Sequence, residues 1–85
     1  MIKSYTLVRV KPPTDRTVYA KVKELKEVKG VFVTYGEYDL LVEIEVNDLN
    51  DLDSFIFSKL RSIEGVESTT TLIEARPYDQ KGNPS

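Results

Sequence analysis

The stretch VFVTYGEYDLLVEIEV, from Val31 to Val46, constrains the fold more than any other part of the chain. It contains two runs rich in β-branched and aromatic residues, separated by the polar segment YGEYD. Glycine tolerates a positive φ and aspartate can bond back to its own backbone, so these runs predict a β-hairpin. The second run alternates between two faces, which predicts one core face and one exposed or partner-facing face. The core face holds Leu40, Val42, Ile44 and Val46, and the other face holds Leu41, Glu43 and Glu45.

The length and composition limit the kind of domain that can contain this hairpin. A chain of 85 residues is expected to form one small domain, which buries only about 60% of its unfolded surface, so self-association is a common way to gain stability. The absence of cysteine and histidine excludes disulfides, thiolate nucleophiles, zinc sites and serine-histidine catalysis. No segment resembles a signal peptide or a membrane span of about 20 apolar residues, so we expect a cytoplasmic protein without a membrane partner.

The charges are unevenly distributed along the chain, although the net charge is only −2. Residues 1–30 contain eight Lys/Arg and three Asp/Glu, whereas residues 31–85 contain four and eleven. Most of the early basic residues fall on a predicted helix with Glu24 and Glu27, and a solvated face with mixed charge pairs explains them. A nucleic-acid patch is the alternative, but the acidic remainder and the lack of aromatic-basic strand motifs argue against direct nucleic-acid contact.

A strand and a helix are predicted before the hairpin. Residues 4–10 form the strand, which ends at Pro12-Pro13 because proline cannot donate to a β-ladder. The helix is capped by Thr14 or Asp15 and closed by Gly30. Its apolar stripe consists of Val18, Val22 and Leu25.

A helix and a strand are also predicted after the hairpin. The second helix runs from Leu49 or Asp51 to Ile63, and Gly65 ends it before a threonine-rich strand over residues 66–74. Core packing is the favoured role of the two phenylalanines beside its apolar stripe. That stripe holds Leu52, Ile56, Leu60 and Ile63, and the phenylalanines are Phe55 and Phe57.

The predicted elements follow the order βαββαβ. With right-handed crossovers, this order closes into an α+β, ferredoxin-like sandwich: a four-stranded antiparallel sheet with both helices on one face. We expect this domain to span residues 1–76, followed by a flexible C-terminal tail over residues 77–85. The other sheet face would have no cover, so we expect two sheets to pack face to face in a homodimer. The predicted interface consists of Tyr5, Leu7, Arg9, Leu41 and Glu43. Arg9 is expected to pair with Glu43 or Glu45, either within the chain or across the interface.

The residues from Val28 to Ile44 and from Ile63 to Leu72 resemble the effector-binding domain of the Lrp/AsnC transcription regulators. This module is called RAM, for regulation of amino acid metabolism. The motif VxGVxxxxxGxYDLxVxI and the later IxGV with a threonine-rich strand carry the resemblance. Full regulators also carry an N-terminal helix-turn-helix, whereas Met1 here opens almost directly onto the first strand. The resemblance therefore implies a stand-alone version that does not bind an operator as the full-length regulators do.

The resemblance also implies an assembly and a ligand. Dimers would form through the sheets and assemble further, commonly into octamers, with an amino acid bound between dimers and no cofactor or metal. A full-length Lrp-type regulator is a possible partner by co-assembly. An amino acid offers an ammonium, which Asp39 can accept, and a carboxylate, which suits hydroxyls and turn N–H groups. The implied ligand-binding residues are Gly36, Glu37, Tyr38 and Asp39 from the turn and Thr69 and Thr71 from the last strand of a neighbouring protomer.

Two other kinds of function fit the same residues. In the first, the domain is purely structural: Gly36 and Asp39 only shape the turn, Tyr38 only contacts the partner, and the threonines are ordinary strand formers. In the second, the domain is a small enzyme with Asp39 or Glu37 as a base and Tyr38 as an acid. No phosphate loop, metal-ligand set or cofactor motif supports the enzyme, so the sequence favours a binding module.

Overall fold

The computed structural model describes residues 1–75 of the chain. The elements are β1 (Ile2–Val10), α1 (Asp15–Lys23), β2 (Val28–Val33), β3 (Leu40–Val46), α2 (Leu49–Ser54), the π-helix η1 (Phe55–Leu60) and β4 (Val66–Ile73). Because α2 runs directly into η1, the two form one helical segment, and the order is the predicted βαββαβ. The expected flexible tail lies outside the described residues.

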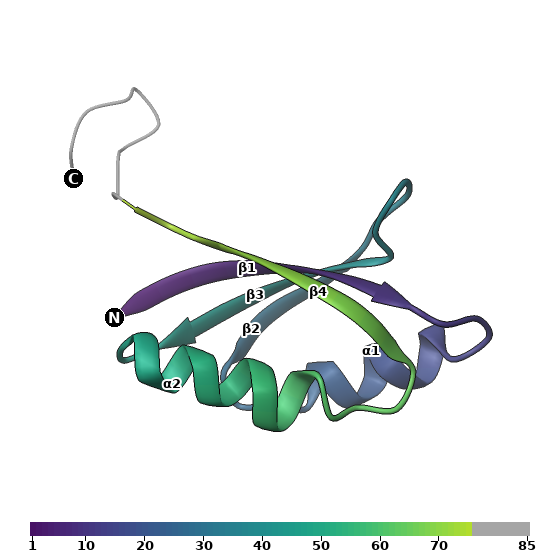
Figure 1. The fold of residues 1–85 in the computed structure, drawn as a ribbon. Helices are drawn as coiled ribbons and strands as arrows, with labels where there is room; N and C mark the ends of the chain where they lie inside the picture. Colours follow the sequence, from purple (N-terminus) through teal and green to yellow (C-terminus); the bar gives the residue numbers. More distant parts are fainter. Residues whose placement is uncertain (76–85) are drawn as a thin grey trace.

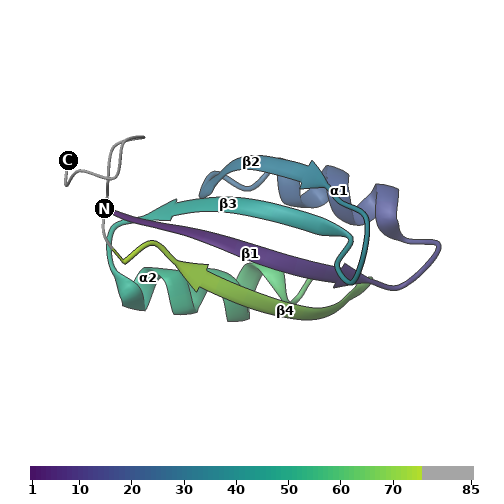
Figure 2. The ribbon, with the colours of Figure 1, turned by 90° about the horizontal axis from the view of Figure 1, so that it is seen from above.

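The four strands form one antiparallel sheet in the order β2-β3-β1-β4. Both helical segments lie on the same side of this sheet, below it in Figure 1 and behind it in Figure 2. The predicted ferredoxin-like α+β fold is therefore confirmed. We call the sheet face away from the helices the open face.

The core lies between the sheet and the helices, where side chains of alternate strand positions meet the helical stripes. In β1, Val8 and Val10 point into this layer, and Ser4 and Thr6 are also fully buried there. All four predicted core residues of β3 are buried, which confirms the predicted alternation. The helices contribute Val18, Val22, Leu52, Phe55, Ile56 and Leu60.

The first helix is shorter than predicted. It ends at Lys23, and Gly30, expected to close it, instead lies inside β2. Two hydrogen bonds between residues three positions apart lead the chain from the helix into the strand. The Leu25 N–H donates to the Val22 carbonyl, and the Val28 N–H donates to the Leu25 carbonyl. The β-branched run from Val28 onward favours the strand, and this preference outweighs the helical spacing.

The second helical segment begins as predicted but changes its geometry halfway. The Asp48 carboxylate accepts a hydrogen bond of 2.8 Å from the Asp51 N–H, which caps α2. At the end of η1, the Arg61 N–H donates to the Ile56 carbonyl, five residues earlier, as in a π-helix. The prediction that Phe57 packs in the core is wrong, since its side chain is 63% exposed. The Arg61 guanidinium lies 5.2 Å from the centre of its ring.

Gly65 fixes how η1 turns into β4 next to the start of α1. Its φ is +104°, and a Cβ atom there would lie 2.8 Å from side-chain carbons of Thr14 and Val18. Only glycine satisfies both the backbone angle and the close approach. Its carbonyl also accepts a hydrogen bond of 2.8 Å from the Lys11 N–H, so this residue joins three segments.

Candidate functional site

The loop 34–39, which joins β2 to β3, rises on the open face, opposite the helices (Figure 1). Its base is closed by two hydrogen bonds, from the Thr34 N–H to the Asp39 carbonyl at 2.9 Å and from Thr34 Oγ1 to the Tyr38 carbonyl at 2.8 Å. Gly36, with a φ of +107°, forms the exposed bend. The predicted turn residues therefore lie together on the side of the sheet that the helices leave uncovered.

Arg9 of β1 holds this loop over the sheet. Its Nε donates to the Glu37 carbonyl and its Nη2 pairs with Glu37 Oε1, both at 3.2 Å. Its guanidinium carbon lies 5.5 Å from the centre of the Tyr38 ring, and the Tyr38 hydroxyl lies 3.2 Å from Thr70 Oγ1 on β4. Within the chain Arg9 thus pairs with Glu37, so the expected pairing with Glu43 or Glu45 in the same chain is wrong, whereas the pairing across a dimer interface stays a prediction. The ion pair is exposed to water, so it orients the loop more than it stabilises the fold.

Asp39 connects the loop to the end of β1. Its Oδ2 accepts a hydrogen bond of 2.8 Å from the Val10 N–H, and its own N–H donates to the Val8 carbonyl at 2.9 Å. The register between β1 and β4 shifts between Arg9 and Val10, so the carboxylate serves a backbone group next to this irregularity. Oδ1 has no such bond within the described residues, which leaves one oxygen for a further donor.

The three threonines of β4 divide between the two sheet faces. Thr70 pairs with Leu7 on the open face, next to Tyr38. Thr69 and Thr71 pair with the buried Val8 and Thr6, which face the helices. Thr71 Oγ1 lies 3.0 Å from Thr6 Oγ1. Within one chain the structure brings Thr70 to the loop and does not bring Thr69 or Thr71 there.

The open face carries a continuous row of large side chains. The predicted interface residues Tyr5, Leu7 and Leu41 lie on it, since Tyr5 pairs with Glu43 and Leu7 with Leu41. Two more apolar residues, missed in the sequence, complete the row: Leu72 pairs with Tyr5, and Phe32 with Leu41. Both are more than half exposed. Their alternation was visible in the sequence, but the pairing that assigns them to this face was not.

A cavity of about 270 Å³ lies at the base of the loop, on the helix side of the sheet, between α1 and the start of β3. It is lined mostly by apolar surface, from Tyr19, Val33 and Leu40, with a few charged groups. Those groups are the carboxylates of Asp15 and Asp39 and the guanidinium of Arg16. A mainly apolar lining with a few polar groups of both signs is typical of small-molecule sites.

Two absences were found within the described residues. None of the helices in residues 1–75 is long and apolar enough to cross a membrane. In the same part of the chain, no group of three or more Asp or Glu side chains is arranged to hold a metal ion.

The topology and the loop define a ferredoxin-like α+β domain with one uncovered sheet face. The sequence profile of the family described as Lrp/AsnC ligand binding domain matches residues 3–84. The chain belongs to this family, which confirms the resemblance found in the sequence.

Individual relatives agree with the family assignment. The HTH-type transcriptional regulator FL11 of Pyrococcus furiosus is 35% identical over 79 residues, which are 93% of this chain and 52% of that protein. The crystal structure of TTHA0845 from Thermus thermophilus is similar with a TM-score of 0.89 and 31% identity, over 94% of this chain and 100% of that one. The L-Met complex of the transcriptional regulator NMB0573 from Neisseria meningitidis shares the fold, with a TM-score of 0.79 and 24% identity, over 86% and 49% of the two chains.

The chain spans about half the length of the curated relatives it matches, 45% and 52% of two Pyrococcus furiosus regulators. These relatives are HTH-type transcriptional regulators. The present chain is therefore a regulator-related ligand-binding domain by family and by fold.

Proposed function

We propose that this chain is an amino-acid-binding, effector-sensing module that acts as a homodimer and assembles further, with octamers as the expected form. The observation that carries the proposal is the loop 34–39: Arg9 holds its tip over the open face, while its base, through Thr34 and Asp39, lines a cavity on the helix side of the sheet with charges of both signs. The family membership and the L-Met complex of a protein with the same fold support this proposal.

The charges beside the loop suit the two ends of an α-amino acid. Asp39 keeps one carboxylate oxygen for an ammonium, and Asp15 lies on the same cavity. Arg16 can bind a carboxylate through two parallel hydrogen bonds. Gly36 lets a ligand or a second copy approach the backbone closely, because nothing lies within 4 Å of the place a Cβ would occupy. Glu37 and Tyr38 do not line this cavity; we propose that they meet the ligand in the assembled protein, where Thr69 and Thr71 of a neighbouring protomer stay the candidates on the other side.

The open face supports the assembly part of the proposal. It presents Tyr5, Leu7, Phe32, Leu41 and Leu72 together, and apolar rows of this size usually mark a partner surface. A second copy of the same sheet is the simplest partner, because a two-fold interface buries the same row on both sides. A full-length Lrp-type regulator with the same domain would fit this face equally well, and the module would then act without touching DNA itself.

The assembly is tested by analytical ultracentrifugation at micromolar concentration. We expect a dimer or a multiple of it, and we expect Leu72→Glu to dissociate it because the new carboxylate would be buried between the sheets. Leu49→Glu is the matched control, since Leu49 on α2 is as exposed as Leu72, at 55%. A monomeric wild-type protein, or equal behaviour of the two variants, would refute assembly through the open face.

Ligand binding is tested by thermal unfolding with each of the standard amino acids. A ligand at about 100 times its Kd stabilises the folded state by roughly 2.7 kcal/mol, which raises the Tm of a domain this small by about 10 °C or more. Asp39→Asn should reduce this shift. A panel that changes neither the Tm nor the assembly state would contradict amino-acid binding.

A second function, an assembly domain without a ligand, is favoured by one observation. Glu37 and Asp39 already have partners within the chain, Arg9 and the Val10 N–H. In that case Leu72→Glu would still dissociate the assembly, whereas the amino-acid panel would have no effect. No enzymatic reaction is proposed, because the relatives are transcriptional regulators.

A further inference from the structure

Both helical segments carry the same pattern of three side chains on one side. Each has an acidic, an aromatic and a basic residue at intervals of four, which places the three on one face of the helix, one turn apart. We call these surfaces the α1 flank and the α2 flank. The α1 flank consists of Asp15, Tyr19 and Lys23, and the α2 flank consists of Asp53 on α2, Phe57 on η1 and Arg61 directly after η1.

The basic group of each flank lies over the aromatic ring of the same flank. Lys23 Nζ is 5.7 Å from the centre of the Tyr19 ring, and the Arg61 guanidinium carbon is 5.2 Å from the centre of the Phe57 ring. None of the four charged groups of the two flanks forms an ion pair within residues 1–75. The helix dipole favours acidic residues at the start of a helix and basic residues at its end. It does not account for an aromatic side chain as exposed as Phe57, at 63%, between them.

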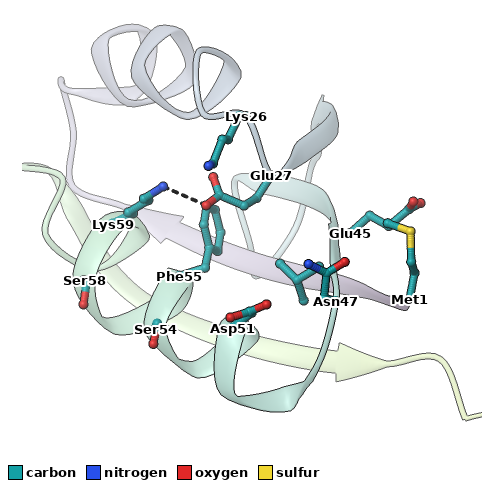
Figure 3. Close-up of a pocket in the computed structure, with 11 residues that line it drawn as sticks. Met1, Lys26, Glu27, Glu45, Asn47, Asp51, Ser54, Phe55, Ser58 and Lys59 are labelled. Atoms are coloured by element: carbon teal, nitrogen blue, oxygen red, sulfur yellow. Dashed lines mark hydrogen bonds and ion pairs between the residues drawn. The ribbon is translucent and has the colours of Figure 1, made fainter.

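The α2 flank points away from the first helix. The opposite side of α2 and η1 faces the connection between α1 and β2 across a second cavity, of about 490 Å³ (Figure 3). There the Lys59 Nζ of η1 donates a hydrogen bond of 2.7 Å to Glu27 Oε2. Burial acts to raise the pKa of Glu27, but this hydrogen bond and the charges of Lys59 and Lys26 outweigh it, so the pKa lies below its ordinary value. Lys59 and Phe57 are two residues apart, so they point to nearly opposite sides of the helix.

The two flanks lie at opposite edges of the domain. Figure 2 shows α1 beside β2 and α2 beside β4, which are the two edge strands of the sheet. Tyr19 lines the cavity at the base of the loop 34–39 together with Val33 of β2, so the α1 flank faces the β2 edge. Each helix runs back against the strand before it, and β1 and β3 are antiparallel, so the two helices are antiparallel as well. A neighbouring copy in the same orientation therefore presents its α2 flank antiparallel to the α1 flank.

We propose that the α1 flank of one copy packs against the α2 flank of the next copy of this chain. Tyr19 then meets Phe57 of the neighbouring copy, and each acidic group meets the basic group of the other flank. The contact joins two different surfaces, so it repeats around a closed ring or along a chain of copies. It depends on the proposed function, since it would join the dimers that the open face builds. The opposite charges that meet are Asp15 with Arg61 and Lys23 with Asp53.

The two flanks also match in extent. Each covers eight residues, which is about 12 Å of helix at roughly 1.5 Å per residue. Because α1 ends at Lys23, Leu49 lies beyond the contact and stays a control for the open face. Tyr19 also lines the cavity of the proposed effector site, so Phe57 of the neighbouring copy would lie at the edge of that site.

The test is analytical ultracentrifugation of the full chain, without amino acids, on variants that exchange the two charges within one flank. The α1 exchange is Asp15→Lys with Lys23→Asp, and the α2 exchange is Asp53→Arg with Arg61→Asp, so neither changes the net charge. Each exchange alone sets like charges opposite each other in the proposed contact. We therefore expect each to sediment as a dimer at concentrations where the wild type forms a larger assembly. The chain with both exchanges restores the opposite charges and should form the larger assembly again.

Phe57→Ser tests the same contact without any change of charge. Its side chain is exposed, so the variant should keep the circular dichroism spectrum and the dimer. It should weaken the larger assembly about tenfold or more, as expected for an aromatic side chain at the centre of an interface.

Four results would overturn the contact between the two flanks. A contact between two equal flanks keeps opposite charges in each exchange, so an exchange variant that assembles like the wild type excludes the proposed contact. Failure of the combined exchange to reassemble, or wild-type assembly of Phe57→Ser, would exclude it too. A wild type that stops at the dimer would overturn this contact and leave the open-face dimer intact. Exchange variants that sediment as monomers would instead support this contact and refute the dimer through the open face.

Discussion

Two glycines with nearly the same backbone angle provide a test of what shapes this fold. Gly65 and Gly36 have φ values of +104° and +107°, so alanine at either position costs about 1–3 kcal/mol in backbone strain. Around Gly36 the space for a Cβ is empty, whereas at Gly65 that Cβ would lie 2.8 Å from carbons of Thr14 and Val18. Overpacking of this kind adds about 1–3 kcal/mol. We therefore expect Gly65→Ala to destabilise the fold by about 1–3 kcal/mol more than Gly36→Ala.

The measurement is urea unfolding followed by circular dichroism at one fixed protein concentration, because assembly would contribute to the apparent stability. A small domain has a total unfolding free energy of roughly 5–15 kcal/mol, so Gly65→Ala should unfold at a clearly lower urea concentration. If the loss reaches the upper end of the expected range, part of the variant will be unfolded before urea is added. Equal losses in the two variants would refute the reasoning, because they would mean that α1 can move away from Gly65 without cost.

Three further predictions concern the polar contacts described above. Asp39→Ala leaves the Val10 N–H without its acceptor and should cost about 1–3 kcal/mol in urea unfolding, whereas Asp39→Asn keeps an amide oxygen and should cost less; equal losses would exclude the hydrogen bond as the cause. Arg9→Gln should change the stability by less than about 1 kcal/mol but speed hydrogen exchange in the loop 34–39, and unchanged exchange would show that Arg9 does not hold the loop. Because folding lowers the pKa of Glu27, its contribution is present above the ordinary value of 4.5 and is lost as the pH falls through the folded value. The stability difference between wild type and Glu27→Gln should therefore shrink as the pH falls below 4.5, and a constant difference would contradict this.

Local patterns in the sequence were sufficient for the order of elements and for most of the core. The alternation in β3 and the helical spacing of Val18, Val22, Leu52 and Leu60 each identify one buried face, and all of these side chains are buried. The pattern failed where two preferences competed. Val28 continues the helical spacing of the first helix, but it also begins the valine-rich segment Val28–Val33. That segment forms β2.

The exposed Phe57 shows a second limit of the pattern. It lies beside the buried Phe55 and Ile56 in a segment whose turns are wider than those of an α-helix. The predicted stripe itself keeps its phase, because Leu52, Ile56 and Leu60 are all buried. Phe57 was placed only beside this stripe, and the spacing alone does not tell which of the two flanking phenylalanines turns to the solvent.

The contacts of the candidate site were less predictable than the fold, because they join residues far apart in the chain. Arg9 and Glu37 are separated by 28 positions, and Tyr38 and Thr70 by 32. The turn motif drew attention to the loop, but the contacts that the loop makes depend on strand order and on a register shift next to Arg9. The second cavity likewise collects residues from four separate segments, which no local motif describes.

The bond between the Asp39 carboxylate and the Val10 N–H has a consequence for how a bound effector would be sensed. Near this end of β1 a backbone amide is satisfied by a side chain rather than by a neighbouring strand. An effector ammonium bound to the Asp39 carboxylate would weaken the hydrogen bond that this carboxylate accepts from the Val10 N–H. Binding at the loop would then affect β1, a central strand of the sheet, without any movement of a helix. The amide of residue 10 would then act as a reporter of effector occupancy from inside the fold.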